Sequence, residues 1–127
     1  MGYTHYWKVK EMLEVSPKQR ELIDEVLKEH ADILDIETNT NRELVLNGIG
    51  ADSHETFVIE FGKKTEFEFC KTARKPYDIP VCKILLVLRY SKGFNLSSDG
   101  DIDETNMEGD TGWAVASEWL NTRLEND

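Results

Sequence analysis

The stretch Asp78–Lys92, which reads DIPVCKILLVLRYSK, is the most hydrophobic part of the chain and decides the fold. Its aliphatic residues cover nearly the whole circumference of a helix, so we expect a helix over 79–92 that is buried on most sides. Asp78 suits the N-cap and Pro80 is tolerated in the first turn, while Gly93 ends the helix. Other elements must therefore cover this helix on several sides.

The remaining elements follow from apolar periodicity and turn residues. Ser16, Pro17 and Gln19 form a capping box that opens a helix, whose apolar stripe fades near Asp35. A last helix is expected over 112–124. Strands are expected over 3–9, 44–46, 56–61, 65–70 and 94–97. The order β-α-β-β-β-α-β-α predicts one α+β domain over residues 1–127. We expect a two-layer sandwich, with a mostly antiparallel sheet and helices on one face.

The composition limits the classes of function. Fifteen basic and 25 acidic residues give a net charge of −10, which argues against a protein that binds DNA or a membrane over its whole surface. An acidic surface can instead compete for a basic site on another protein. The start lacks the features of a signal peptide and the longest aliphatic run is only Ile84–Leu88, so we expect a cytoplasmic protein. The two cysteines, Cys70 and Cys82, are expected to be reduced thiols.

A basic segment, Phe69–Asp78 (FCKTARKPYD), precedes the hydrophobic helix. Cationic side chains beside a helix N-terminus favour an anion such as phosphate or carboxylate. The alternative is a solvated loop whose cations pair with nearby carboxylates. The candidate ligand-binding residues are Lys71, Arg74 and Lys75, with Tyr77 to stack on a base or to donate a hydrogen bond.

An acidic loop over 98–111 is the second candidate surface. Asp99, Asp101 and Asp103 match the start of a calcium-binding loop, but Glu104 stands where glycine is needed and Asp110 where a bidentate glutamate is needed. We therefore predict a solvated acidic loop and no metal site or cofactor; the alternative is adventitious binding of a divalent cation. For a partner protein, the candidate contacts are Asp99, Asp101, Asp103 and Glu104, together with a partly exposed Trp113.

Histidine chemistry is the third candidate. His5 and His54 become an acid–base pair if their strands neighbour each other, whereas His30 lies on an apolar helix stripe and is expected to pack. Cys70 follows a strand near three cations that can lower its pKa, although a structural thiol is the preferred interpretation. The sequence contains no P-loop, zinc-protease, nucleophile-elbow or dinucleotide motif.

Four short motifs resemble a family of small proteins found in tailed phages and in bacterial genomes. They are GYTHYW at 2–7, HETF at 54–57, FCKTARKPYD at 69–78 and SSDGD at 97–101. The resemblance implies a phage-type accessory protein that acts in the host cytoplasm on host defence or metabolism. It implies no particular reaction.

Two hypotheses follow. The first, favoured by the lack of catalytic motifs, is a non-enzymatic binding protein that inhibits or sequesters a host component, through the acidic surface or through the basic segment. The alternative is a small enzyme acting on a nucleotide or phosphate ester, with His5 or His54 as acid–base groups and Lys71, Arg74 and Lys75 holding phosphate. The enzyme requires His5, His54, Arg74 and Asp99 to meet in one pocket. The oligomeric state does not follow from the sequence.

Overall fold

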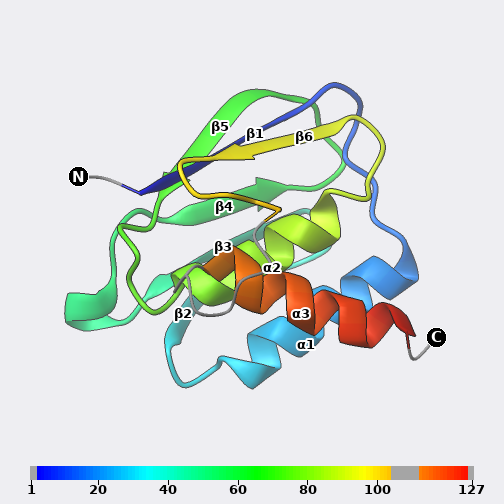
Figure 1. Ribbon diagram of the computed structural model, residues 1–127. Helices are drawn as coiled ribbons and strands as arrows, with labels where there is room; N and C mark the ends of the chain where they lie inside the picture. The colour runs from blue at the N-terminus through cyan, green and yellow to red at the C-terminus, as the bar shows by residue number, and fades with distance from the viewer. Residues whose placement is uncertain (1–2, 104–111, 126–127) are drawn as a thin grey trace.

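The structure, a computed structural model, describes residues 3–103 and 112–125 (Figure 1). These residues form six strands, three α-helices and one short 3-10 helix. The elements are β1 (Thr4–Val9), α1 (Pro17–Glu29), β2 (Leu34–Asn39), β3 (Glu43–Gly48), η1 (Gly50–Asp52), β4 (Phe57–Glu60), β5 (Thr65–Lys71), α2 (Asp78–Leu88), β6 (Phe94–Ser98) and α3 (Gly112–Glu125). The predicted α+β sandwich is thus confirmed.

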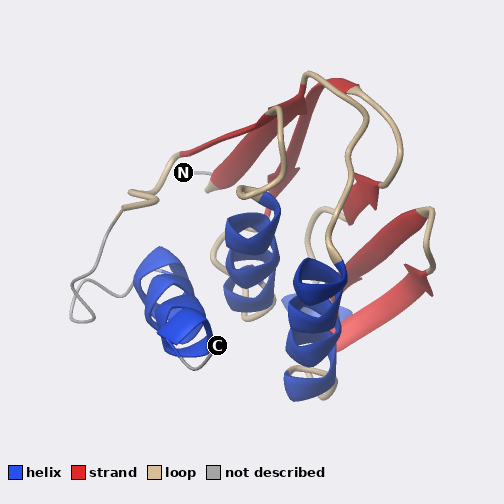
Figure 2. Cartoon of the chain, turned by 90° about the vertical axis from the view of Figure 1, so that its right-hand side faces the viewer, coloured by secondary structure: helices blue, strands red, loops and turns tan. Residues whose placement is uncertain are grey.

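The strands make two small antiparallel sheets rather than the one sheet that we expected. One sheet has the order β5-β1-β6 and the other has the order β2-β3-β4. The turn between β4 and β5 carries the chain from one sheet to the other. Figure 2 shows the helices gathered on one side of the strands. The β5-β1-β6 sheet therefore has an inner face toward the helices and an outer face away from them.

α1 begins where the capping box predicts. Ser16 Oγ accepts from the backbone N of Gln19 at 3.1 Å, and Gln19 Oε1 accepts from the backbone N of Ser16 at 2.8 Å. The helix ends at Glu29, however, and the expected extension to Asp35 is wrong. Residues Leu34–Asn39 leave the helix because they pair with β3 to form an additional strand, β2.

α2 is the central helix, as the hydrophobic stretch predicts. Every residue from Pro80 to Leu88 is buried, and the helix lies between α1 and α3 (Figure 2). It is shorter than expected, since it ends at Leu88. Among the described residues, no helix combines the length and the apolar character that crossing a membrane requires.

Candidate functional site

A cluster of buried polar side chains lies on the inner face of the β5-β1-β6 sheet, next to the N-terminus of α2. His5 is its centre and is fully buried. His5 Nδ1 lies 2.7 Å from Ser98 Oγ, and His5 Nε2 lies 2.6 Å from Asp78 Oδ1. The alternation of β1 turns His5 inward together with Trp7 and Val9, and the first turn of α2 brings Asp78 to meet it.

The hydrogen bonds around Ser98 fix the tautomer of His5. Ser98 Oγ lies 3.0 Å from Trp113 Nε1 and 3.0 Å from the backbone N of Gly100, and both of these groups can only donate. Because both lone pairs of Ser98 Oγ are then occupied, its hydroxyl proton is the one that points to His5 Nδ1. His5 is therefore neutral, with its proton on Nε2, and this N–H donates to Asp78.

Asp78 is a buried carboxylate surrounded by donors. Besides His5, Thr72 Oγ1 donates to Asp78 Oδ1 at 2.6 Å and the Cys82 thiol donates to Asp78 Oδ2 at 3.7 Å. Such donors offset the cost of removing a carboxylate from water. Burial, and then the charge of Asp78, raise the pKa of the Cys82 thiol well above its usual range. The thiol therefore stays protonated.

The same three side chains have donor atoms of the kinds that zinc prefers. The imidazole, carboxylate and thiol atoms of His5, Asp78 and Cys82 all lie within 4.8 Å of one another. Coordination through His5 Nε2 would require the proton to move to Nδ1, which already faces the hydroxyl proton of Ser98. The hydrogen bonds therefore fit a closed polar network better than a metal site.

Aromatic rings and glycines enclose this network. The ring centroid of His5 lies 5.1 Å from that of Tyr3 and 4.8 Å from that of Trp113, both edge to face. A Cβ atom on Gly100 would lie 2.1 Å from Tyr3 Oη, and one on Gly112 would lie 2.7 Å from Asp78 Oδ2. No larger residue fits at either position without displacing the cluster.

The basic segment is joined to the cluster by a strained turn. The backbone N–H groups of Thr72 and Ala73 both donate to Tyr3 O, at 3.1 and 3.2 Å. Ala73 and Arg74 then adopt left-handed conformations, with φ of 53° and 58°, which cost energy for residues other than glycine. The Arg74 guanidinium lies 4.0 Å from the ring centroid of Tyr3, and its side chain is exposed.

The structure differs from two of the expectations for the basic segment. Tyr77, predicted to meet a ligand, is fully buried and donates its hydroxyl to Glu55 O at 2.6 Å. Asp78 does not cap α2: Tyr77 holds the N-cap position, without a side-chain hydrogen bond, and Asp78 lies in the first turn. A carboxylate there offsets the positive end of the helix dipole. An anion would thus be held by the side chains of Lys71, Arg74 and Lys75 rather than by the helix end.

The acidic loop is partly used within the fold. Asp99 accepts hydrogen bonds from Thr4 N at 3.0 Å and from Tyr6 Oη at 3.2 Å. Asp101 accepts from the backbone N of Asp103, and Asp103 pairs with Arg89 at 3.5 Å. Glu104 lies outside the described residues. Trp113 is fully buried, so the expectation of a partly exposed partner contact at this position is wrong.

The histidines are separated. His54 is exposed, and its backbone bonds to Asn47. None of the hydrogen bonds within residues 3–103 joins His54 to His5. His30 Nε2 lies 3.1 Å from Lys83 Nζ, and burial lowers the pKa of both groups. The structure therefore supplies one enclosed histidine and no acid–base pair among the described histidines.

Cys70 behaves as the preferred interpretation predicts. It is fully buried, and burial raises the pKa of its thiol to about 12. The neighbouring cations do not overcome this effect, because the side chain faces the core. Both cysteines are free.

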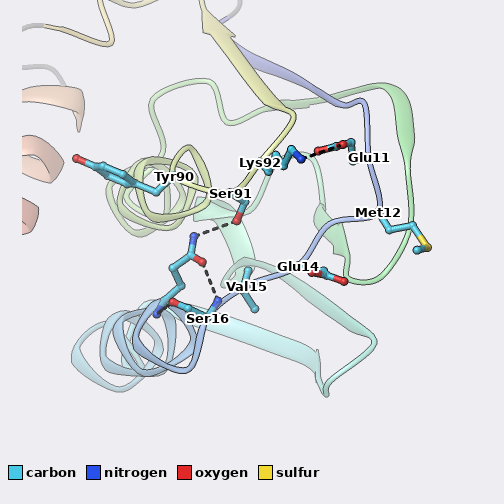
Figure 3. A pocket seen from close by; sticks show the side chains of 9 residues that line it. Glu11, Met12, Glu14, Val15, Ser16, Tyr90, Ser91 and Lys92 are labelled. Carbon is cyan, nitrogen blue, oxygen red and sulfur yellow. Dashed lines mark hydrogen bonds and ion pairs between the residues drawn. The ribbon is translucent and has the colours of Figure 1, made fainter.

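A groove of about 560 Å³ lies elsewhere, between the segment after β1 and the turn after α2 (Figure 3). Gln19 Nε2 crosses it to Ser91 Oγ at 2.9 Å, and Lys92 pairs with Glu11 at 3.7 Å. None of the residues predicted for a site lines this groove, and several of its polar side chains bind one another.

Comparison with known protein families, with curated proteins and with solved structures gave no match. The buried cluster itself draws on three of the four motifs quoted above, with Thr72, Ser98 and Gly100 as members that sequence reasoning did not single out. The signal for His5 lay in the alternation of Tyr3, His5, Trp7 and Val9, which puts a histidine on the core side of its strand. Residues such as Ser98 carried no signal by themselves, because their role depends on contacts between distant segments.

Proposed function

We propose that the protein is a non-enzymatic accessory binding protein of phage type. It would inhibit or sequester a component of the host, in particular a component of host defence. It would act in the host cytoplasm and hold an anionic group of its ligand or partner on Lys71, Arg74 and Lys75.

One observation carries the proposal: the exposed guanidinium of Arg74 is held in place before any ligand arrives. Two consecutive left-handed residues and the stacking on Tyr3 restrict the side chain of Arg74. Backbone strain of this kind is concentrated at binding and catalytic sites. A cation held in advance loses less conformational entropy when it binds, and guanidinium suits phosphate or carboxylate.

The buried cluster supports a binding role rather than a reaction. Thr72 ties the strained turn to Asp78, and His5 ties Asp78 to β1 and β6. The cluster therefore acts as the base on which Arg74 is positioned. The acidic surface is a weaker candidate for the binding site, because Asp99 and Asp103 already have partners within the fold.

The experiment combines native mass spectrometry of the purified protein with calorimetric titration of pyrophosphate and nucleoside triphosphates. Mass spectrometry reports retained small molecules and proteins that copurify. We expect Arg74→Ala to weaken anion binding about tenfold or more, as the loss of a charged hydrogen bond predicts. Lys64→Ala, an exposed lysine in the turn before β5, is the matched control. Equal affinities of the two variants, or a wild-type protein that binds no anion and no partner, would reject the proposal.

The alternative enzyme keeps one observation in its favour. Ser98, His5 and Asp78 form a continuous chain of hydrogen bonds of the kind that activates a hydroxyl. Against it, both lone pairs of Ser98 Oγ accept hydrogen bonds, and His54 does not join the chain. Turnover of a panel of nucleotides and phosphate esters, lost in His5→Gln and in Ser98→Ala, would establish the enzyme in place of the binding protein.

A further inference from the structure

The outer face of the β5-β1-β6 sheet carries a row of aromatic side chains. Phe67 is 59% exposed and Phe69 is 47% exposed, and Tyr6 lies beside them. The ring of Tyr6 stacks on Phe67 with a centroid distance of 6.0 Å and an angle of 24° between planes. Phe67 and Phe69 are also 6.0 Å apart. Two exposed rings and a half-buried third thus lie together on the sheet face opposite the buried His5 and Trp7.

The pairing of the strands explains why these rings face outward. Tyr6 pairs with Phe69, and both neighbours of Tyr6 on β1, His5 and Trp7, are buried on the inner face. On β5 the buried residue is Cys70, so the phenyl rings two positions apart must take the other side. The register leaves no freedom to turn Phe69 inward without exposing Cys70.

Cationic and small polar groups share this face. Lys8 follows Tyr6 by two residues, and Lys71 pairs with Thr4, which precedes Tyr6 by two. A hollow of about 100 Å³ on the face has Lys8 as its one charged residue. It is lined by Tyr6, Trp7, Lys8, Phe67, Asn95, Leu96 and Ser97. Asp99 bonds to Tyr6 Oη and so fixes the ring rather than standing free.

We propose that this face binds a single-stranded nucleic acid. Bases stack on Phe67 and its aromatic neighbours, while Lys8 and Lys71 contact the phosphates on either side. Sheets with exposed aromatic rings bind unpaired bases in this way, because every base has a π-face. The positive groups at both ends of the aromatic row complement a phosphate backbone, although the chain as a whole has a charge of −10. The net negative charge restricts binding to this face and keeps the protein off duplex DNA.

This inference goes beyond the proposed function and uses different residues, apart from Lys71. The experiment is fluorescence anisotropy of labelled 12-nucleotide oligo(dT) and oligo(U), titrated with the full chain at 50 and 200 mM salt. We expect Phe67→Ala to weaken binding at least about fivefold, since stacking on one ring contributes that much or more. Contacts with two phosphates predict a salt slope of roughly −1.4 for a single strand.

Tyr90→Ala is the matched control, because Tyr90 is 68% exposed but belongs to the segment after α2. Phe67→Leu keeps an apolar side chain and should still weaken binding, which separates stacking from folding. Circular dichroism confirms that the variants fold. The oligo(dT) and oligo(U) arms distinguish DNA from RNA.

The proposal is overturned if wild-type protein binds neither oligonucleotide at 50 mM salt, or if Phe67→Ala and Tyr90→Ala behave alike. Binding of a protein at this face in place of an oligonucleotide also overturns it. Arg74→Ala reports separately on the proposed function, since Arg74 packs on Tyr3 at the inner side of the sheet.

Discussion

Each face of the β5-β1-β6 sheet carries residues that an ordinary half-buried sheet would place on the other face. Beside apolar residues such as Trp7, the inner face encloses a buried histidine bonded to a half-buried serine and a buried carboxylate, whereas the outer face exposes Phe67 and Phe69. Sheets with one wet face normally bury their apolar residues and expose their polar ones. Here His5, Ser98 and Asp78 are satisfied by one another, so they are tolerated. The aromatic residues outside have no such compensation, which makes them candidates for binding rather than for stability.

The largest expected difference between the two faces is the loss of stability on replacing Asp78, which belongs to the buried network of the inner face. Asp78→Ala removes the acceptor of His5 and Thr72 and leaves buried donors unpaired. We expect it to lower the free energy of unfolding by about 2–6 kcal/mol, because each of the two buried donors left without an acceptor costs about 1–3 kcal/mol. Urea denaturation measures this loss. Asp103→Ala, whose salt bridge with Arg89 is exposed, should cost less than about 0.5 kcal/mol. Similar values for the two variants would remove the claim that the inner network supports the fold.

The sequence predicted the positions of helices and strands better than it predicted which of their side chains face the core. The capping box at Ser16 was sufficient to predict the start of α1, and the apolar run was sufficient to predict the buried helix α2, because both signals are local. β2 was missed because Leu34 continues the helical stripe of α1, and only pairing with β3 draws it into a sheet. The alternation of Phe69 and Cys70 was visible, but which of them faces the core depends on the pairing with β1. Trp113 was expected to be partly exposed, but it is fully buried, and its indole reaches Ser98 on another element.

The tight packing of the inner face can be tested by adding a single methyl group. In Gly100→Ala, the new Cβ atom meets Tyr3 Oη at 2.1 Å, so either the ring or the loop must move. We expect a loss of about 1–3 kcal/mol in the free energy of unfolding, as for other overpacked sites. Ser97→Ala, at an exposed position on the same segment, serves as the control and should be near neutral. A neutral Gly100→Ala would mean that the enclosure of His5 is loose.

Tyr3 tests whether the inner network is complete. Within residues 3–103 and 112–125 its buried hydroxyl forms no hydrogen bond of normal geometry, so Tyr3→Phe should raise the free energy of unfolding at pH 7 by about 1 kcal/mol. Burial, reinforced by the charge of Asp78, raises the pKa of Tyr3 to about 12. In the wild type, the unfolded chain loses this proton near pH 10 and the folded chain only near pH 12, so stability falls across that interval. The variant lacks this loss, and its advantage should grow from pH 10 to pH 12. Urea titrations at pH 7, 10 and 11 measure both effects, and a variant less stable than the wild type at pH 7 would indicate a hidden partner for the hydroxyl.

The outer face should show the smallest effect on stability. Phe67→Ser removes a ring that is 59% exposed and whose aromatic contacts, with Tyr6 and Phe69, are at the surface. We expect a loss of at most about 0.5 kcal/mol, the range of an exposed cross-strand contact. Phe57→Ala is the contrasting variant, since Phe57 is fully buried against Trp7 and should cost about 3–5 kcal/mol. If Phe67→Ser proved as costly as Phe57→Ala, the outer rings would have a folding role, and their exposure would no longer argue for a binding face.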